Sequence, residues 1–231
     1  FLIGSSTNFM YGEKYPYAQT IKGNTESIVR VLKEQGYYTT SIHANEGKFY
    51  NRDKAYKYLG FDNSVFIDDM EDLEEHYEDC VQDIDTAEEV VKQYENMTSD
   101  KKFIFAITME SHMPYAADKY ENKEITVETD LVKGEELINL EAYVQGLYNF
   151  DKSINYLINY FENKEEEVIL VFYGDHKPAF KTIFADKYEQ SIGRYETPYV
   201  IWSNYEAEFE SPELISIAGL SMEILNKANI N

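Results

Sequence analysis

Apolar residues along the chain follow two spacings, one typical of amphipathic helices and one typical of buried strands. Helical spacing, in places with a polar cap or a glycine stop, predicts helices over residues 25–35, 51–59, 85–96, 137–161 and 212–227. The acidic stretch 69–79 also has helix-forming composition. Runs rich in β-branched, aromatic or other apolar residues predict strands over residues 37–43, 64–67, 103–108, 168–173 and 199–202.

The alternation of helices and strands predicts an α/β fold. The runs 103–108 and 168–173 are almost continuously apolar, which is typical of strands buried on both faces. We therefore expect a mainly parallel sheet with helices on both faces. The polar segment 119–134 is expected to be a surface excursion, and 231 residues suit a single domain over residues 1–231.

Composition narrows the function classes. Forty-three acidic and 21 basic residues give a formal net charge of −22, which repels polyanions, so nucleic-acid binding is not expected. The single cysteine, Cys80, excludes an intramolecular disulfide. No apolar run approaches the roughly 20 residues that span a bilayer. The chain has no initiator methionine, and we expect it to be a domain that is incomplete at both ends.

Three of the four histidines follow predicted strands. His43, His112 and His176 each come at the end of a strand or a few residues after it, whereas His76 lies in the acidic stretch. In open α/β sheets, ligands bind at the carboxyl ends of the strands. A single histidine is more often a structural residue, but three at the same sheet edge predict a functional site.

The pair Asp175–His176 has the chemistry of a metal site. A carboxylate and an imidazole that follow Gly174 at a strand end can both face one divalent cation. Two ligands do not complete a coordination sphere, and the chain has no cysteine cluster or HxxxH motif. The remaining ligands are expected from other strand ends or from outside this chain.

Arg52 is the candidate for binding an anion. Its guanidinium suits two oxygens of a phosphate or sulfate, although an ion pair with Asp53 is an equally good interpretation. The neighbouring Phe49 and Tyr50 either belong to the core or face a ligand.

Other polar residues near the strand ends carry weaker signals. Asn45, Glu46 and Glu110 are further oxygen donors close to the same sheet edge. With 43 carboxylates in the chain, proximity in sequence says little about their role. We expect Cys80 to have no nearby cation that would lower its pKa, and therefore to be inert.

Four blocks of the sequence resemble one known family in its order. They are YPYAQTIKGNTESIVRVLKEQGYYTTSIHANEGKFYNRDKAYKYLGFD, ITMESHMPY, LVFYGDHKP and TPYVIWSN. These blocks are similar to the extracellular catalytic domain of the lipoteichoic acid synthase family, the sulfatase-like phosphoglycerol transferases of the alkaline phosphatase superfamily. The resemblance implies an alkaline phosphatase or sulfatase-like fold on the outward face of a bacterial membrane, in a membrane-anchored protein.

The resemblance also implies roles for individual residues. It implies a Mn²⁺ or Mg²⁺ site with Asp175 and His176 as ligands and His112 as a catalytic residue. It further implies that His43, Arg52, Phe49 and Tyr50 bind the substrate, an anionic lipid headgroup or a glycerol-phosphate polymer. Tyr50 stands where some members carry tryptophan, and Asn45 where some carry aspartate.

The family's reaction uses a threonine that becomes covalently attached to the phosphoglycerol. That threonine and a glutamate metal ligand lie upstream of the segment resembling residues 1–11, so we expect an N-terminally truncated domain with further ligands upstream of residue 1. A metal-activated threonine would attack phosphatidylglycerol, release diacylglycerol and pass phosphoglycerol to an acceptor. The alternative is a non-catalytic module of the same fold that binds an anionic glycopolymer or a lipid headgroup.

Overall fold

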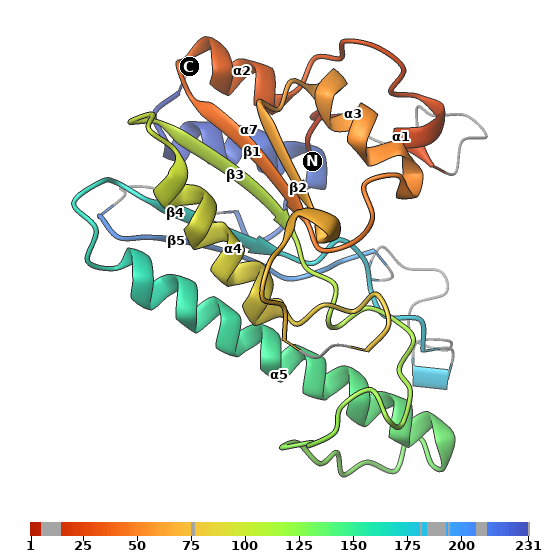
Figure 1. Ribbon diagram of the computed structural model, residues 1–231. Helices are drawn as coiled ribbons and strands as arrows, with labels where there is room; N and C mark the ends of the chain where they lie inside the picture. The colour runs from red at the N-terminus through yellow and green to blue at the C-terminus, as the bar shows by residue number, and fades with distance from the viewer. Residues whose placement is uncertain are drawn as a thin grey trace. The chain divides into compact units, whose positions relative to one another are not determined.

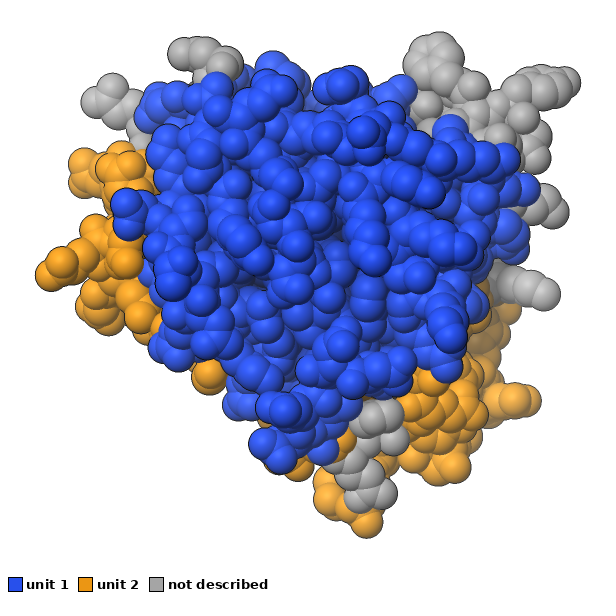
Figure 2. All heavy atoms as spheres, turned by 45° about the horizontal axis from the view of Figure 1, so that its top comes forward, with its two compact units in different colours: residues 1–73, 85–108, 207–231 blue, residues 74–84, 109–206 orange. Residues whose placement is uncertain are grey.

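The chain divides into two structural units. The computed structural model describes residues 1–5, 15–74, 77–180, 182–183, 193, 195–206 and 212–230 (Figure 1). Unit 1 comprises residues 1–73, 85–108 and 207–231, and unit 2 comprises residues 74–84 and 109–206 (Figure 2). Each unit is described by itself.

Unit 1 contains a three-stranded parallel sheet. Its strands are β1 (Tyr38–His43), β2 (Asn63–Phe66) and β3 (Lys102–Ile107), in the order β2-β1-β3. His43 pairs with Phe66 on one side and with Ile107 on the other, so the three strands end together. Residues 39–43 of the central strand are all buried, which means that both faces of β1 are covered.

Helices pack against this sheet and form the apolar core of unit 1. They are α1 (Pro16–Gln19), α2 (Ile28–Glu34), α3 (Arg52–Leu59), α4 (Asp83–Asn96) and α7 (Ile217–Lys227), and two 3₁₀ turns cover Phe49–Asn51 and Ile67–Asp69. Figure 1 shows α2 and α3 on one side of the sheet and α4 on the other. The buried core residues are Leu2, Ile21, Ile28, Val29, Leu32, Ala55, Tyr56, Leu59, Phe61 and Leu225.

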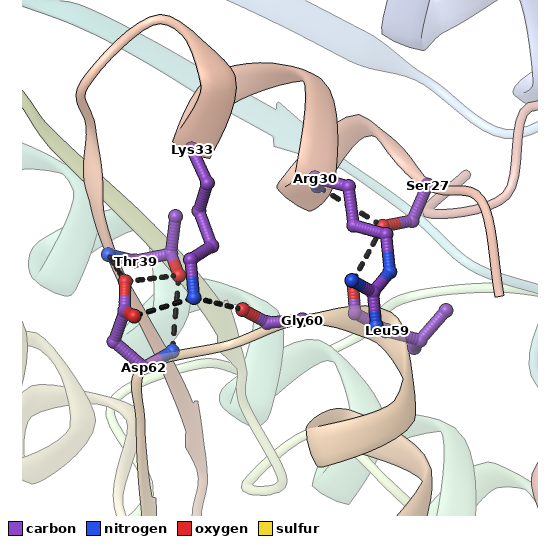
Figure 3. Close-up of polar contacts among 7 residues, drawn as sticks. All are labelled: Ser27, Arg30, Lys33, Thr39, Leu59, Gly60 and Asp62. Atoms are coloured by element: carbon purple, nitrogen blue, oxygen red, sulfur yellow. Dashed lines mark hydrogen bonds and ion pairs between the residues drawn. The ribbon is translucent and has the colours of Figure 1, made fainter. Parts of the chain in front are cut away.

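Polar contacts join α2 to the end of α3. Ser27 caps α2 by accepting a hydrogen bond from the backbone N–H of Arg30 at 3.2 Å, and its hydroxyl donates to the carbonyl of Leu59 at 2.6 Å (Figure 3). The guanidinium of Arg30 donates to the carbonyl of Tyr58 at 2.8 Å. Two helices are therefore fixed to each other through groups that would otherwise lack partners at helix ends.

Asp62 connects α2 to the central strand. Its carboxylate accepts hydrogen bonds from the backbone N–H and the hydroxyl of Thr39, both at 3.0 Å, and from the Lys33 ammonium at 2.5 Å (Figure 3). Burial alone would raise the pKa of Asp62, but the hydrogen bonds from Lys33 and Thr39 outweigh it and hold the pKa below its usual range.

Unit 2 contains a two-stranded antiparallel sheet and the longest described helix. Its elements are α5 (Glu135–Phe161), β4 (Ile169–Tyr173) and β5 (Tyr199–Ser203). Asn204, just after β5, donates to the carbonyls of Phe161 and Glu166 at 3.2 and 2.9 Å and accepts from the N–H of Val168 at 2.8 Å. One side chain thus fixes the end of α5 to the start of β4.

The α/β fold with a parallel sheet is confirmed, but the second sheet differs from the expectation. β4 pairs antiparallel with β5 rather than joining the parallel sheet in the described part of the chain. The apolar residues of β3 and β4 are mostly half-buried, so the prediction that both strands are buried on both faces is wrong for this structure. An apolar run shows that the side chains are hydrophobic, but it does not show how completely other parts of the protein cover them.

Two further differences concern helices. Asp69 ends a 3₁₀ turn, and the rest of the acidic stretch 69–79 is not helical where it is described, because Asp72 and Glu78 have left-handed φ values of 55° and 49° that a helix cannot include. The apolar positions of α5 are not uniformly buried, since Leu147 is exposed whereas Phe161 is buried. The buried residues of this helix are instead mostly small or polar: Ala142, Gln145, Gly146, Ser153 and Phe161. Within the described residues, no helix is both long enough and apolar enough to cross a bilayer.

Candidate active site

The loop that follows β4 carries the predicted metal ligands. Gly174 donates its N–H to the carbonyl of Pro198 at 3.1 Å and accepts from the Thr197 hydroxyl at 2.6 Å. A Cβ on Gly174 would lie 3.1 Å from Cβ of Thr197, so glycine permits this close approach. The Oδ2 atom of Asp175 lies 3.7 Å from Nε2 of His176, and both side chains are largely exposed.

The ring of His176 is oriented by its own loop. Its Nδ1 lies 3.0 Å from the carbonyl oxygen of Lys177, and because a carbonyl only accepts hydrogen bonds, Nδ1 carries a proton. In the neutral imidazole this leaves the lone pair on Nε2, the atom that faces Asp175. Metal-binding histidines commonly have such a second hydrogen bond to a carbonyl.

His112 repeats this arrangement. Its Nδ1 lies 2.7 Å from the carbonyl oxygen of Met113, and its backbone N–H donates to the carbonyl of Met109 at 3.1 Å. The ring centroids of His112 and His176 are 6.2 Å apart, and the rings are nearly perpendicular. The structure therefore brings together Asp175, His176 and His112, as predicted from the strand ends.

An aromatic cluster joins the two histidine loops. Tyr115, three residues after His112, stacks on Phe180 from the chain after His176 with ring centroids 5.0 Å apart. Tyr143 of α5 packs against both rings at 5.5 and 5.6 Å. Burial raises the pKa of Tyr115 to about 12, so this hydroxyl stays neutral at physiological pH.

A buried pair of carboxyl groups lies beneath the His112 loop. Asp83 and Glu110 are 1% and 3% exposed, and each side chain accepts a hydrogen bond from the other residue's backbone N–H, at 3.1 and 2.8 Å. Burial, followed by the charge of Glu110, raises the pKa of Asp83 to about 8. The second Glu110 oxygen accepts from Nδ2 of Asn149 at 2.5 Å. Both oxygens of Glu110 therefore have partners within the protein, and Glu110 is a structural residue in this conformation.

Helix α5 contacts the same loop through Gly146. A Cβ at this position would lie 2.7 Å from the Tyr120 hydroxyl and 3.0 Å from Cα of Ser111. Gln145 accepts from the N–H groups of Glu124 and Ile125 at 2.7 and 3.1 Å. The buried face of α5 thus packs closely against one loop at Gly146 and accepts hydrogen bonds from another at Gln145.

Lys119 is a buried cation that the sequence did not indicate. It begins the segment expected to be a surface excursion, yet it is only 7% exposed. Its ammonium lies 3.4 Å from the sulfur of Cys80, so the expectation that no cation is near this thiol is wrong. Burial still dominates and raises the pKa of Cys80, which keeps the thiol protonated and unreactive.

In unit 1, Arg52 lies among aromatic rings. Its guanidinium carbon is 5.3 Å from the ring centroid of Tyr50, 5.8 Å from that of Phe49 and 5.9 Å from that of Tyr17. Within the described residues no ion pair joins Arg52 to Asp53, and Nε of Arg52 is buried without an acceptor. The alternative interpretation of Arg52, an ion pair with Asp53, therefore does not hold in this structure.

The backbone before Arg52 explains why the helix begins there. Tyr50 and Asn51 both have left-handed φ values, 57° and 56°, which non-glycine residues adopt at some energetic cost. The two left-handed residues interrupt the helical conformation of the backbone between the 3₁₀ turn and α3. Phe49 and Tyr50 consequently remain substantially exposed, and Tyr15 stacks on Tyr50 at 4.8 Å.

His43 differs from the other candidate residues because its side chain is only 1% exposed. It is the last residue of β1, and its carbonyl accepts from the N–H of Asn45 at 2.7 Å. Asn45 in turn accepts from the N–H of Glu46 at 2.6 Å, which gives Asn45 a local structural role. That His43, Arg52, Phe49 and Tyr50 bind the substrate stays a prediction, and His76 lies outside the described residues.

The donors at Asp175 and His176 fit part of the coordination shell of a divalent cation. A carboxylate and an imidazole oriented by a backbone carbonyl are the ligand types that Mn²⁺ and Zn²⁺ accept. The described residues contain no group of three or more histidine, cysteine, aspartate or glutamate side chains that could hold a metal. The pair is therefore a partial site.

Comparisons with known proteins identify the family of the chain. The profile of the family described as Sulfatase matches residues 3–230. A Rhizobium meliloti protein, whose name assigns it provisionally to cyclic β-1,2-glucan modification, is 30% identical over 98% of this chain. The lipoteichoic acid synthase of Staphylococcus aureus is 26% identical over 73% of this chain. The aligned regions cover only 37% and 26% of these two relatives.

Solved structures share the fold. The Streptococcus pyogenes phosphoglycerol transferase GacH, in complex with sn-glycerol-1-phosphate, has a TM-score of 0.81 and 23% identity, covering 97% of this chain and 59% of that one. The periplasmic domain of EcEptC from Escherichia coli, in complex with Zn, has a TM-score of 0.58 and 18% identity, covering 78% of this chain and 52% of that one. The resemblance to lipoteichoic acid synthases is thus confirmed in sequence and fold, and the chain belongs to the sulfatase family.

Proposed function

We propose that this chain is part of a metal-dependent phosphoglycerol transferase, or of a closely related sulfatase-like hydrolase, that acts on phosphate or sulfate esters such as phosphatidylglycerol headgroups. The observation that carries the proposal is the convergence of Asp175, His176 and His112 on two loops joined by an aromatic cluster. Each of the two imidazoles keeps Nε2 available for a ligand.

Each residue has a role that follows from its chemistry. Asp175 and His176 would hold a divalent cation, Mn²⁺ or Mg²⁺, which when bound supplies positive charge that stabilises the transferred phosphoryl group. His112, which carries its proton on Nδ1, would take up a proton at Nε2 and deliver it to the oxygen of the leaving group. Arg52 would bind a substrate oxygen, with Phe49 and Tyr50 against the uncharged part of the substrate.

The reaction transfers a phosphoglycerol group in two steps. In the first, the oxygen of a threonine outside this chain forms a bond to phosphorus, the bond to the diacylglycerol oxygen breaks, and that oxygen takes up a proton. In the second, the oxygen of an acceptor hydroxyl forms a bond to phosphorus, the bond to the threonine oxygen breaks, and the threonine oxygen takes up the proton that the acceptor hydroxyl loses. The names of the relatives support a polymer or glycan acceptor, and they favour a site facing outward from a bacterial membrane.

The test uses the natural full-length protein with Mn²⁺ and a fluorescent phosphatidylglycerol analogue. Release of the diacylglycerol product is expected, and Asp175→Ala and His112→Gln should each lower kcat by at least about 100-fold. Asp151→Asn, which removes an exposed carboxylate from α5, is the matched control and should leave turnover unchanged.

Two outcomes would contradict the proposal. The first is equal activity in the parent and in Asp175→Ala. The second is absence of turnover across phosphate and sulfate esters, with glycan and glycerol-phosphate acceptors supplied and the metal bound. Binding of an anionic glycopolymer without turnover would then favour the non-catalytic module.

A further inference from the structure

The ammonium of Lys119 makes directed contacts although it is almost completely buried. It donates to the backbone carbonyl of His112 at 2.5 Å and to the sulfur of Cys80 at 3.4 Å. The rings of Tyr115 and Tyr120 lie 5.9 and 6.0 Å from it. Lysine is rarely buried to this extent without partners that compensate the lost hydration.

The His112 ring depends on its main chain for its position. The side chain is exposed, and its Nδ1 bonds to the carbonyl of Met113 in the same turn. The ring is therefore fixed relative to the turn at residues 112–113. The position of Nε2 then depends on the contacts that fix the backbone of this turn. At the carbonyl of His112 itself, the Lys119 ammonium donates at 2.5 Å and the Cys80 thiol at 3.8 Å, so the contact from Lys119 is the shorter one.

A buried pair of carboxyl groups lies near this cation. Glu110 and Asp83 lie beneath the same turn, and the positive charge of Lys119 lowers the pKa of Asp83, although burial and the charge of Glu110 outweigh this effect and leave the pKa at about 8. An apolar side chain of similar length would fill this space without the desolvation cost of an ammonium. A lysine at this place is therefore explained by its hydrogen bond to the turn rather than by packing alone.

We propose that Lys119 is a positioning residue, whose ammonium holds the carbonyl of His112 and thereby keeps Nε2 of His112 directed at the reacting group near His176. This inference rests on the proposed function only for the identity of the reaction. The placement of the His112 ring is a separate property that can be measured without turnover.

The first experiment measures the ring itself. ¹⁵N-histidine NMR of the 231-residue chain at about pH 7.5, where an ordinary imidazole is mostly neutral, reports which ring nitrogen carries the proton. His112→Gln assigns the signal. In Lys119→Met we expect His112 to change from one tautomer, protonated at Nδ1, to a mixture, while His176 stays unchanged. Lys133→Met, which removes an exposed lysine of the same segment, should change neither signal.

The second experiment measures turnover in the full-length protein. Lys119→Met should lower kcat by about 100-fold with little change in KM, as expected when a reacting group is misplaced by about 1 Å. Lys119→Arg keeps a charged donor and should recover part of kcat. If Lys119→Met does not fold, Lys119→Arg decides the question, since its altered hydrogen-bond geometry should still lower kcat at unchanged KM.

The outcomes separate this inference from the proposed function. An unchanged His112 signal together with unchanged kcat, in the folded Lys119→Met or otherwise in Lys119→Arg, would overturn the positioning role. A wild-type protein without turnover on any ester would instead contradict the proposed function, and the NMR comparison would still decide the role of Lys119.

Discussion

The imidazole rings of His112 and His176 lie with their centroids 6.2 Å apart, and each directs Nδ1 to the carbonyl oxygen of the residue that follows it. Two loops from distant parts of the sequence therefore present the same ring nitrogen, Nε2, through the same local hydrogen bond. Neither ring depends on a neighbouring carboxylate for its tautomer. This arrangement suits a site where one imidazole binds a cation and the other moves a proton.

Manganese binding by the 231-residue chain is expected to be weak. Asp175 and His176 supply only part of a coordination shell, so we expect a Kd in the ~micromolar range or weaker. His176→Ala should abolish the binding that remains, whereas Asp151→Asn should not. Titration calorimetry checks this, and tight stoichiometric binding by the chain would contradict the ligand assignment.

Asp83 should make stability depend on pH. Its pKa in the folded protein is about 8, far above that of an unfolded aspartate, about 3.9, so the folded state binds the extra proton between these values. The free energy of unfolding should therefore fall as pH rises from about 4 to about 8. Asp83→Asn should remove this part of the dependence and be the more stable protein at about pH 9. Parallel pH profiles for the two proteins would show that Asp83 titrates normally.

Gly146→Ala should destabilise the protein by about 1–3 kcal/mol, despite the higher helix propensity of alanine, because the added methyl group meets Tyr120 and the backbone of Ser111. Gly23→Ala is the control, since a Cβ there has no neighbour within 4 Å. Urea unfolding measures both. Equal midpoints would show that the His112 loop tolerates displacement by α5.

Asp62→Asn should weaken the connection between α2 and the central strand. The pKa of Asp62 lies below that of an unfolded aspartate, so its contribution is present above about pH 4 and is lost as pH falls through the folded-state pKa. We expect a loss of about 1 kcal/mol at pH 7, kept small by the partial exposure of Lys33. At about pH 2 the variant and the parent should unfold alike, and a loss that persists there would assign the effect to shape rather than charge.

Arg52→Lys should raise KM for an anionic substrate by about 10-fold or more, because an ammonium cannot reproduce two parallel hydrogen bonds or lie flat against the rings of Phe49 and Tyr50. Lys54→Arg, two residues further on at an exposed position, is the matched control. Initial rates over a range of substrate concentrations check this. An unchanged KM would place Arg52 outside the substrate site.

Local sequence patterns predicted the elements well. The strand ending at His43 and the helix ending before Gly60 lie where the pattern placed them, because β-branched runs and glycine stops act through the backbone of a few residues. The strand-end rule also predicted that His112 would meet the Asp175–His176 pair. The element boundaries depend on local chemistry, whereas the meeting of the two histidine loops takes place within unit 2 and does not come from a shared parallel sheet.

Contacts between distant segments were not predictable in this way. Lys119 occurs in a polar segment, and only the tertiary structure shows its ammonium beside Cys80, 39 residues earlier. The polar part of the buried face of α5 was not predicted because Gln145 and Gly146 are not apolar, although a glycine inside a long helix was the available signal of a close approach. The periodicity of apolar residues predicts which apolar side chains are buried, but it does not predict burial of polar side chains that form hydrogen bonds.

The Asp83–Glu110 pair and its Asn149 partner make the His112 loop a poor candidate for transplantation. If residues 109–114 were grafted onto another scaffold, the Glu110 side chain would lose both hydrogen bonds that it accepts here. A buried carboxylate without hydrogen-bond partners would destabilise the grafted conformation of the loop. A graft that works must carry three separate segments, from the start of α4, the loop and the middle of α5. The position of His112 therefore cannot be reproduced by grafting the loop alone, because it depends on the other two segments as well.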